Sequence, residues 1–201
     1  MKYTFKASDL TEEKSLFHIY KATREIEVNK FDFFFTLVIS IFLFLNSFFL
    51  SPSPELLQAI RLWAPIAFGF TITTLGFLIT GFTIFATINK PDLFLALMNI
   101  KHPKYNLTFL KYVYGVFMRV FIYFITWSVF YLIIILFGAE NGLIEKVANL
   151  FGINLELKVL AVRVCYIMIG CSAIYLVLSI KTFIFNIYIM LMQALRWEMK
   201  R

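Results

Sequence analysis

Six small or hydroxyl-bearing residues recur at regular intervals within one long apolar segment, and they are the first candidates for a functional site. They are spaced 4, 3, 4, 3 and 4 residues apart, on one face of a helix: Gly69, Thr73, Gly76, Thr80, Thr83 and Thr87. In lipid, small residues let helices approach closely, and a 3.5-residue period suits a left-handed crossing. The stripe indicates either a packing seam, within one chain or between copies, or the lining of an aqueous pore. Packing is the preferred interpretation.

A second candidate is a group of basic residues that follows this segment. Its members are Lys90, Lys101, His102, Lys104, Lys111 and Arg119. Cations at this position are typical of the inner surface of a membrane, where they hold the topology and can contact anionic lipid. If several copies enclosed a pore, Lys90 would place a positive ring at its inner mouth and favour anions. We expect no direct contact with nucleic acid.

The sequence contains no arrangement of residues that is typical of a conventional enzyme active site. His18 and His102 are solitary, so we expect no metal site. No Ser, Cys or Lys lies in a recognisable nucleophile motif, and the glycines form no phosphate-binding loop. No ionisable residue lies near the middle of an apolar run, where ion-coupled transporters need one. We therefore expect a protein that is not an enzyme and binds no cofactor.

Composition indicates that lipid surrounds much of the chain. Hydrophobic residues make up 61% of the 201 residues, against roughly 45–50% in soluble domains. Charges interrupt the apolar sequence only between four runs, and eighteen helical residues reach about 27 Å, close to the hydrocarbon thickness. The sequence predicts an all-α integral membrane protein with four transmembrane helices, at about 33–50, 62–88, 113–137 and 160–181.

The distribution of Lys and Arg predicts the orientation. Fifteen lie in residues 1–30, 89–119 and 181–201, whereas four lie in the two opposite loops. Both termini are therefore expected on the cytoplasmic side of the membrane. Residues 1–30 would form a cytoplasmic amphipathic segment and 31–201 the transmembrane domain, with a cytoplasmic helix at 182–201. The alternative is a fifth span at 182–197.

Three segments outside the spans are predicted to be helical. The first follows Ser8 as N-cap and carries an apolar stripe of Leu16, Ile19, Tyr20 and Ile26. The stripe either packs on the protein's own cytoplasmic extensions, which we prefer, or docks a soluble partner. Another helix should begin at Pro91 and end at Pro103. A third, at 143–151, should stop at Gly152 and lie on the outer membrane surface.

The layout resembles that of small four-span membrane proteins of bacterial anti-phage defence systems, most nearly the Kiwa membrane subunits. The resemblance rests on the charged N-terminal helix, on the stretch GFLITGFTIFATINKPDLF that leaves the second span, and on the extensions of the last two spans. It implies an inner-membrane homo-oligomer, such as a tetramer, that senses phage attack and controls a cytosolic effector. No site residues can be transferred from it.

Three functions are compatible with these features. The first is a non-enzymatic oligomeric sensor or scaffold that docks a cytosolic effector, indicated by the cytoplasmic helices. The second is a homo-oligomeric pore-forming effector or ion channel, indicated by the hydroxyl stripe. The third is a small-solute permease, which is least favoured because no convergent polar pocket is evident in the sequence.

Overall fold

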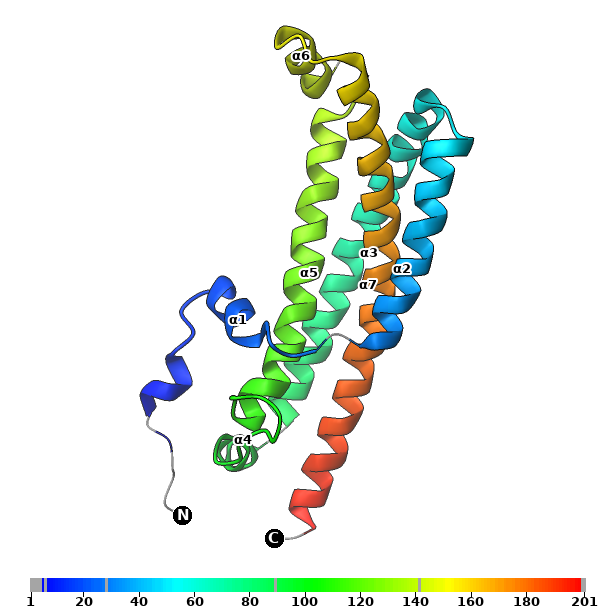
Figure 1. Ribbon diagram of the computed structural model, residues 1–201. Coiled ribbons are helices and arrows are strands. Elements are labelled where there is room, and N and C mark those ends of the chain that lie inside the picture. The colour runs from blue at the N-terminus through cyan, green and yellow to red at the C-terminus, as the bar shows by residue number, and fades with distance from the viewer. Residues whose placement is uncertain (1–4, 6, 28, 89, 141, 200–201) are drawn as a thin grey trace. The chain divides into compact units, whose positions relative to one another are not determined.

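The computed structural model describes residues 5, 7–27, 29–88, 90–140 and 142–199 (Figure 1). Helices make up 83% of the described residues, which form no strand, and this confirms the all-α class. The elements in chain order are η1 (Ala7–Thr11), α1 (Leu16–Thr23), α2 (Lys30–Leu45), η2 (Asn46–Leu50), α3 (Ser53–Ile88), α4 (Pro91–Met98), α5 (Phe109–Phe137), α6 (Leu143–Leu150) and α7 (Leu155–Glu198). Residues 1–4 and 200–201, at the ends of the predicted segments 1–30 and 182–201, lie outside the described residues.

Four helical stretches are long and apolar enough to cross a membrane. They are Lys30–Leu50, Ser53–Thr87, Phe109–Phe137 and Leu155–Glu198, with 21, 35, 29 and 44 residues. A helix needs about 20 apolar residues to span a bilayer, so each is sufficient. The prediction of four helices long and apolar enough to span is confirmed, and it indicates a multi-pass membrane protein.

Two of these helices extend well beyond the predicted spans. α3 begins at Ser53 instead of near residue 62, and α7 continues without a break from Leu155 to Glu198. At 1.5 Å per residue, 44 residues reach about 66 Å. The predicted limits marked where charges interrupt the apolar run, whereas helices end at their caps. Because α7 has no turn at Lys181, residues 182–197 do not form a separate returning span.

The chain divides into two compact units, which are described separately. Unit 2 comprises residues 29–74 and 124–178 and therefore contains α2, η2, α6 and parts of α3, α5 and α7. Its core joins α3, α5 and α7 through buried side chains that include Leu56, Ile60, Tyr131, Ile134 and Ile169. Large apolar side chains remain exposed around this core, as expected for helices whose outer faces contact lipid.

Polar side chains in unit 2 are paired across helices. The pairs are Ser128 with Thr71 (2.9 Å), Tyr131 with Ser172 (2.6 Å) and Asn46 with Tyr166 (2.9 Å). Hydroxyl and amide groups that face a helix interface in lipid need such partners, because no water is present to replace them. These bonds add directional contacts to a core that is otherwise apolar.

The α6 helix ends as its sequence predicts. Gly152 has a φ of 58°, and Ile153 N–H donates to the carbonyl of Ala148 at 2.9 Å. Together with the bond from Gly152 N–H to Asn149 O at 3.1 Å, this is the glycine-dependent stop that caps the last carbonyls of a helix. The large apolar side chains of α6 (Leu143, Ile144, Val147 and Leu150) are all exposed, as the expected position on a membrane surface requires.

Unit 1 comprises residues 1–28, 75–123 and 179–201 and has an aromatic core. The ring of Phe117, whose side chain is fully buried, lies 5.7 Å from Phe82 and 5.1 Å from Phe183 between centroids. These rings join the ends of α3, α5 and α7 that belong to this unit. The packing explains how three long helices stay together outside unit 2.

The N-terminal helix is shorter than the sequence suggested. α1 begins after Ser15, whose hydroxyl accepts a bond from His18 N–H at 3.2 Å, and only the five-residue η1 lies near Ser8. The prediction that Ser8 caps one long helix was wrong, because Ser15 offers a second cap closer to the apolar stripe. Residue 28 lies outside the description.

The connection between α4 and α5 also differs from the prediction. Pro91 opens α4 as expected, but the helix ends at Met98, before Pro103. A hairpin loop follows, in which His102 N–H donates to Leu107 O at 2.9 Å and Phe109 N–H donates to Ile100 O at 2.7 Å. These cross-loop bonds take up the backbone groups that a longer helix would have satisfied.

We expect Tyr131→Phe to lower the stability of the helix bundle modestly. The change removes the hydroxyl that bonds Ser172 and leaves the buried ring in place. Interhelical hydrogen bonds in membranes contribute about 0.6 kcal/mol on average and up to about 1.7. The free energy of unfolding, measured by denaturant titration in detergent micelles, should fall by that amount. The exposed Tyr188→Phe serves as control, and equal effects of both would refute the assignment.

Candidate functional site

The glycine and threonine stripe of α3 lies on the surface of the chain. All six of its residues are exposed. A Cβ added at Gly69 or Gly76 would have no atom of another segment within 4 Å. The hydroxyls of Thr80 and Thr83 donate to carbonyls of their own helix, at Gly76 O and Ile79 O, each at 2.9 Å. The hydroxyls are thus satisfied without an outside partner and can face lipid, another copy or water.

The predicted basic residues do not form one cluster but are divided among separate contacts in unit 1. Lys90 forms an ion pair with Glu198 of α7 at 2.9 Å, and Lys104 forms one with Glu27 at 2.6 Å. The hydrogen bond to Glu27 raises the pKa of Lys104 above its ordinary value. Lys101 is exposed and begins the hairpin loop. Four of the six predicted cations, with Lys111 and Arg119 included, therefore contact other parts of unit 1.

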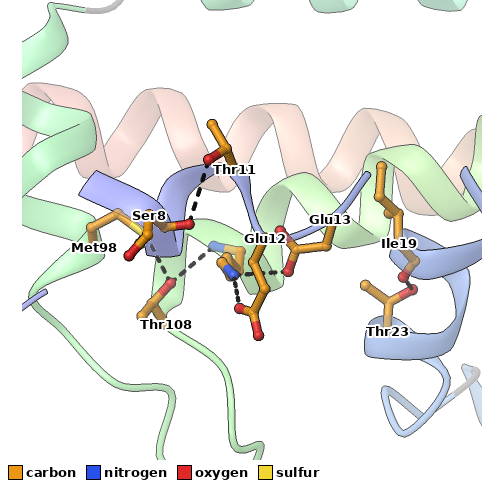
Figure 2. A network of polar contacts seen from close by, with 9 residues as sticks. Ser8, Thr11, Glu12, Glu13, Ile19, Thr23, Met98 and Thr108 are labelled. Atoms are coloured by element: carbon orange, nitrogen blue, oxygen red, sulfur yellow. Dashed lines mark hydrogen bonds and ion pairs between the residues drawn. The ribbon is translucent and has the colours of Figure 1, made fainter. Parts of the chain in front are cut away.

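Lys111 holds the segment between η1 and α1. Its ammonium group lies 2.8 Å from a carboxylate oxygen of Glu12 and 2.8 Å from one of Glu13 (Figure 2). Lys111 and Glu13 are mostly shielded, with side chains 18% and 21% exposed, whereas Glu12 is 73% exposed. An ion pair shielded from water is screened less by salt than an exposed one. The Glu13 contact is therefore the stronger of the two.

Arg119 provides the most buried polar link between the N-terminal segment and α5. Its residue is 9% exposed, and Nη1 donates to Ile26 O at 2.6 Å and to Thr23 O at 3.3 Å. Nη2 donates to the hydroxyl of Tyr123 at 3.3 Å. The last carbonyls of a helix lack partners within the helix, and cations are favoured there. Arg119 therefore caps the end of α1 from a different helix.

Close packing supports this link. A Cβ on Gly115 would overlap the methyl group of Thr23, so only glycine lets α1 approach α5 at this distance. The hydroxyl of Thr23 donates back to Ile19 O at 2.8 Å, which turns its methyl toward Gly115. No sequence pattern marks Gly115 or Thr23, because the contact joins residues far apart in the chain.

The four apolar residues proposed for partner docking have different environments. Ile26 is 5% exposed, and the ring of Tyr20 meets that of Tyr123 edge to face at 6.4 Å. Ile19 lines a cavity between α1 and α5, whereas Leu16 is 51% exposed. Three of the four therefore lie against the rest of unit 1, and Leu16 faces outward.

His102 has a packing role in the hairpin loop. Its ring stacks on Tyr112 at 4.1 Å and on Tyr105 at 4.9 Å between centroids. Its Nδ1 accepts hydrogen bonds from Lys104 N–H at 3.2 Å and Tyr105 N–H at 3.3 Å. The Tyr105 hydroxyl in turn accepts a bond from Glu27 N–H at 3.3 Å. The loop is thus joined to the N-terminal segment at its tip.

An open groove of about 700 Å³ lies between the N-terminal segment and this loop. Its walls carry charges of both signs: Lys21 and Glu25 are exposed on one side, and the half-buried Lys111 and Tyr105 line the other. Such a mixed polar surface suits a protein segment better than a small apolar ligand. Within the described ranges, no three His, Cys, Asp or Glu residues are grouped closely enough to hold a metal ion.

We expect Arg119→Met to release the N-terminal segment from α5. The change preserves side-chain length but removes the donors to Thr23 and Ile26. A hydrogen bond from a charged group contributes about 2 kcal/mol, so amide hydrogen exchange in residues 16–27 should accelerate roughly 30-fold. The exposed Arg24→Met should leave exchange unchanged. Unaltered protection in Arg119→Met would show that the segment is held by other contacts.

The arrangement brings the N-terminal segment, the hairpin loop and the start of α5 together around one groove, and leaves the α3 stripe apart from it on an outer face. No protein-family model, no characterised protein and no solved structure is detectably similar to the chain.

Proposed function

We propose that the chain lies in a bacterial inner membrane with both termini and the charged part of unit 1 on the cytosolic side. The charge of the two units supports this orientation. Unit 1 carries 14 Lys or Arg and seven Asp or Glu residues, whereas unit 2 carries five of each. The whole excess of +7 therefore belongs to unit 1, and segments rich in Lys and Arg are retained on the cytoplasmic side. The N-terminal part of α5 and the C-terminal part of α7 would then be cytoplasmic extensions.

We further propose that the protein acts without catalysis, as an oligomeric sensor or scaffold for a cytosolic effector. The observation that carries this proposal is the 700 Å³ groove whose N-terminal wall is fixed by Arg119 and Lys111. Fixing a docking segment in advance lowers the entropy that binding must overcome. The resemblance to anti-phage defence proteins adds a biological setting, in which the effector responds to phage attack.

Reversing the charges of the groove wall tests the docking role. The double variant Lys21→Glu with Glu25→Lys keeps the net charge unchanged. Each reversed charge would, however, face a group of the same sign on the partner. The full-length protein would be affinity-purified in detergent from its native host, and co-purified cytosolic proteins quantified. We expect one protein recovered with the wild type to fall at least tenfold in the variant, together with loss of phage resistance.

The matched control is the equivalent exchange on α6, Glu145→Lys with Lys146→Glu. Because α6 would lie on the opposite side of the membrane, this variant should keep both the partner and the resistance. Equal recovery with the groove variant would reject the groove as the docking site. A wild type that never retains a cytosolic protein would reject the scaffold.

A homo-oligomeric channel is the second candidate, and the exposure of the whole α3 stripe favours it. Six exposed small or hydroxylated residues on one face could line a water-filled pore if several copies turned that face inward. The same face could equally form a dry seam between copies. The two arrangements differ in whether ions pass.

Ion flux in liposomes separates these arrangements. If the stripe lines a pore, Thr80→Leu with Thr83→Leu should suppress flux severalfold, because the leucines narrow the lumen and remove its hydroxyls. Ile79→Leu with Ile84→Leu, on exposed positions of the same helix outside the stripe, is the control. A purified oligomer that never conducts would exclude the channel.

A further inference from the structure

The C-terminal half of α7 is apolar on two opposite faces. One face is inside unit 1, where Phe183 is 3% exposed and Met190 is fully buried. The other face carries six large apolar side chains that are 37–61% exposed: Ile184, Phe185, Tyr188, Leu191, Met192 and Leu195. Met199, which directly follows the helix, is 89% exposed. The inner face explains how the helix is held in unit 1. The outer face requires a different explanation.

The exposed face has the spacing of a coiled-coil seam. Phe185, Tyr188, Met192, Leu195 and Met199 follow each other at intervals of 3, 4, 3 and 4 residues. This is the heptad pattern in which two positions of every seven meet a neighbouring helix. Side chains scattered over a lipid-facing surface have no need of this period, since lipid contacts every exposed direction equally.

We expect this face to be surrounded by water before any partner binds. α7 is about 66 Å long, more than twice the roughly 30 Å hydrocarbon core, and Lys181 interrupts its apolar run before the seam begins. Near its end, Lys90 and Glu198 form an ion pair whose side chains are 62% and 44% exposed. A solvated ion pair at this level is unfavourable inside hydrocarbon.

The area of the face is large for a surface left in water. Seven side chains that are on average more than half exposed present roughly 700 Å² of apolar surface. The largest patch on an ordinary monomer is about 300–600 Å², and a stable interface buries about 800 Å² on each partner. The face therefore has almost the area that a complete interface needs.

We infer that this face of α7 pairs with the same face of a second copy as a parallel coiled coil. Copies inserted in one orientation are related by rotation about the membrane normal, so their α7 helices must run in the same direction. Parallel, in-register helices with a heptad of large apolar residues satisfy this symmetry without any further segment. The inference rests on the proposed oligomer and on the proposed cytosolic position of unit 1, and it adds the interface.

Disulfide cross-linking in native membranes tests the pairing. Cys165 and Cys171 would first be replaced by alanine, and single cysteines introduced by Tyr188→Cys, Met192→Cys and Leu195→Cys. In a parallel in-register pair, identical seam positions face each other, so mild oxidation should give dimers at all three. The off-seam variants Asn186→Cys and Arg196→Cys should give at least fivefold less cross-linked dimer.

The outcomes distinguish this inference from the proposed function. If native mass spectrometry shows an oligomer but seam cysteines cross-link no better than off-seam ones, the α7 pairing is wrong and the oligomeric scaffold stands. A monomer throughout would overturn both. Efficient quenching by brominated lipid of a fluorophore attached at Leu195→Cys would place the face in the bilayer, which would also overturn the pairing.

Discussion

The structure depends above all on the cost of placing a charge in hydrocarbon. That cost is several kcal/mol for each side chain near the bilayer centre, and it decides where every charged segment can lie. Unit 2, which holds most of the exposed large apolar side chains, has equal numbers of basic and acidic residues. Several of its interhelical polar contacts are hydroxyl or amide pairs, such as Tyr131 with Ser172, which satisfy donors between uncharged groups. The excess positive charge is confined to unit 1.

Within unit 1 the same charges organise the N-terminal segment. Arg119 is buried because it satisfies carbonyl groups at and just after the end of α1, and Lys111 is shielded because two carboxylates neutralise it. Gly115 then sets how closely α1 can approach α5. The cations proposed to orient the chain in the membrane therefore also build the surface proposed to receive a partner. The same basic residues thus have two proposed roles, one in membrane orientation and one in shaping the partner-binding surface.

The sequence was sufficient to predict features that depend on local pattern. Four uninterrupted apolar runs predicted four long helices, Pro91 marked the start of α4, and Gly152 marked the end of α6. It could not predict contacts between distant segments, such as Lys111 with Glu12, because each residue alone fits a solvated surface. The sequence suggested Ser8 as the cap of the N-terminal helix, whereas α1 is capped by Ser15. Periodicity located the α3 stripe, but not the fact that it faces outward.

The orientation of the two units across the membrane is the central claim, because the scaffold, the channel and the α7 pairing all assume it. Single cysteines at Lys14→Cys in unit 1 and Glu145→Cys in α6, in a chain with Cys165 and Cys171 replaced, would be treated in intact cells with a membrane-impermeant maleimide. The account predicts labelling at residue 145 alone, with residue 14 reacting only after the membrane is permeabilised. Labelling of residue 14 in intact cells would contradict it.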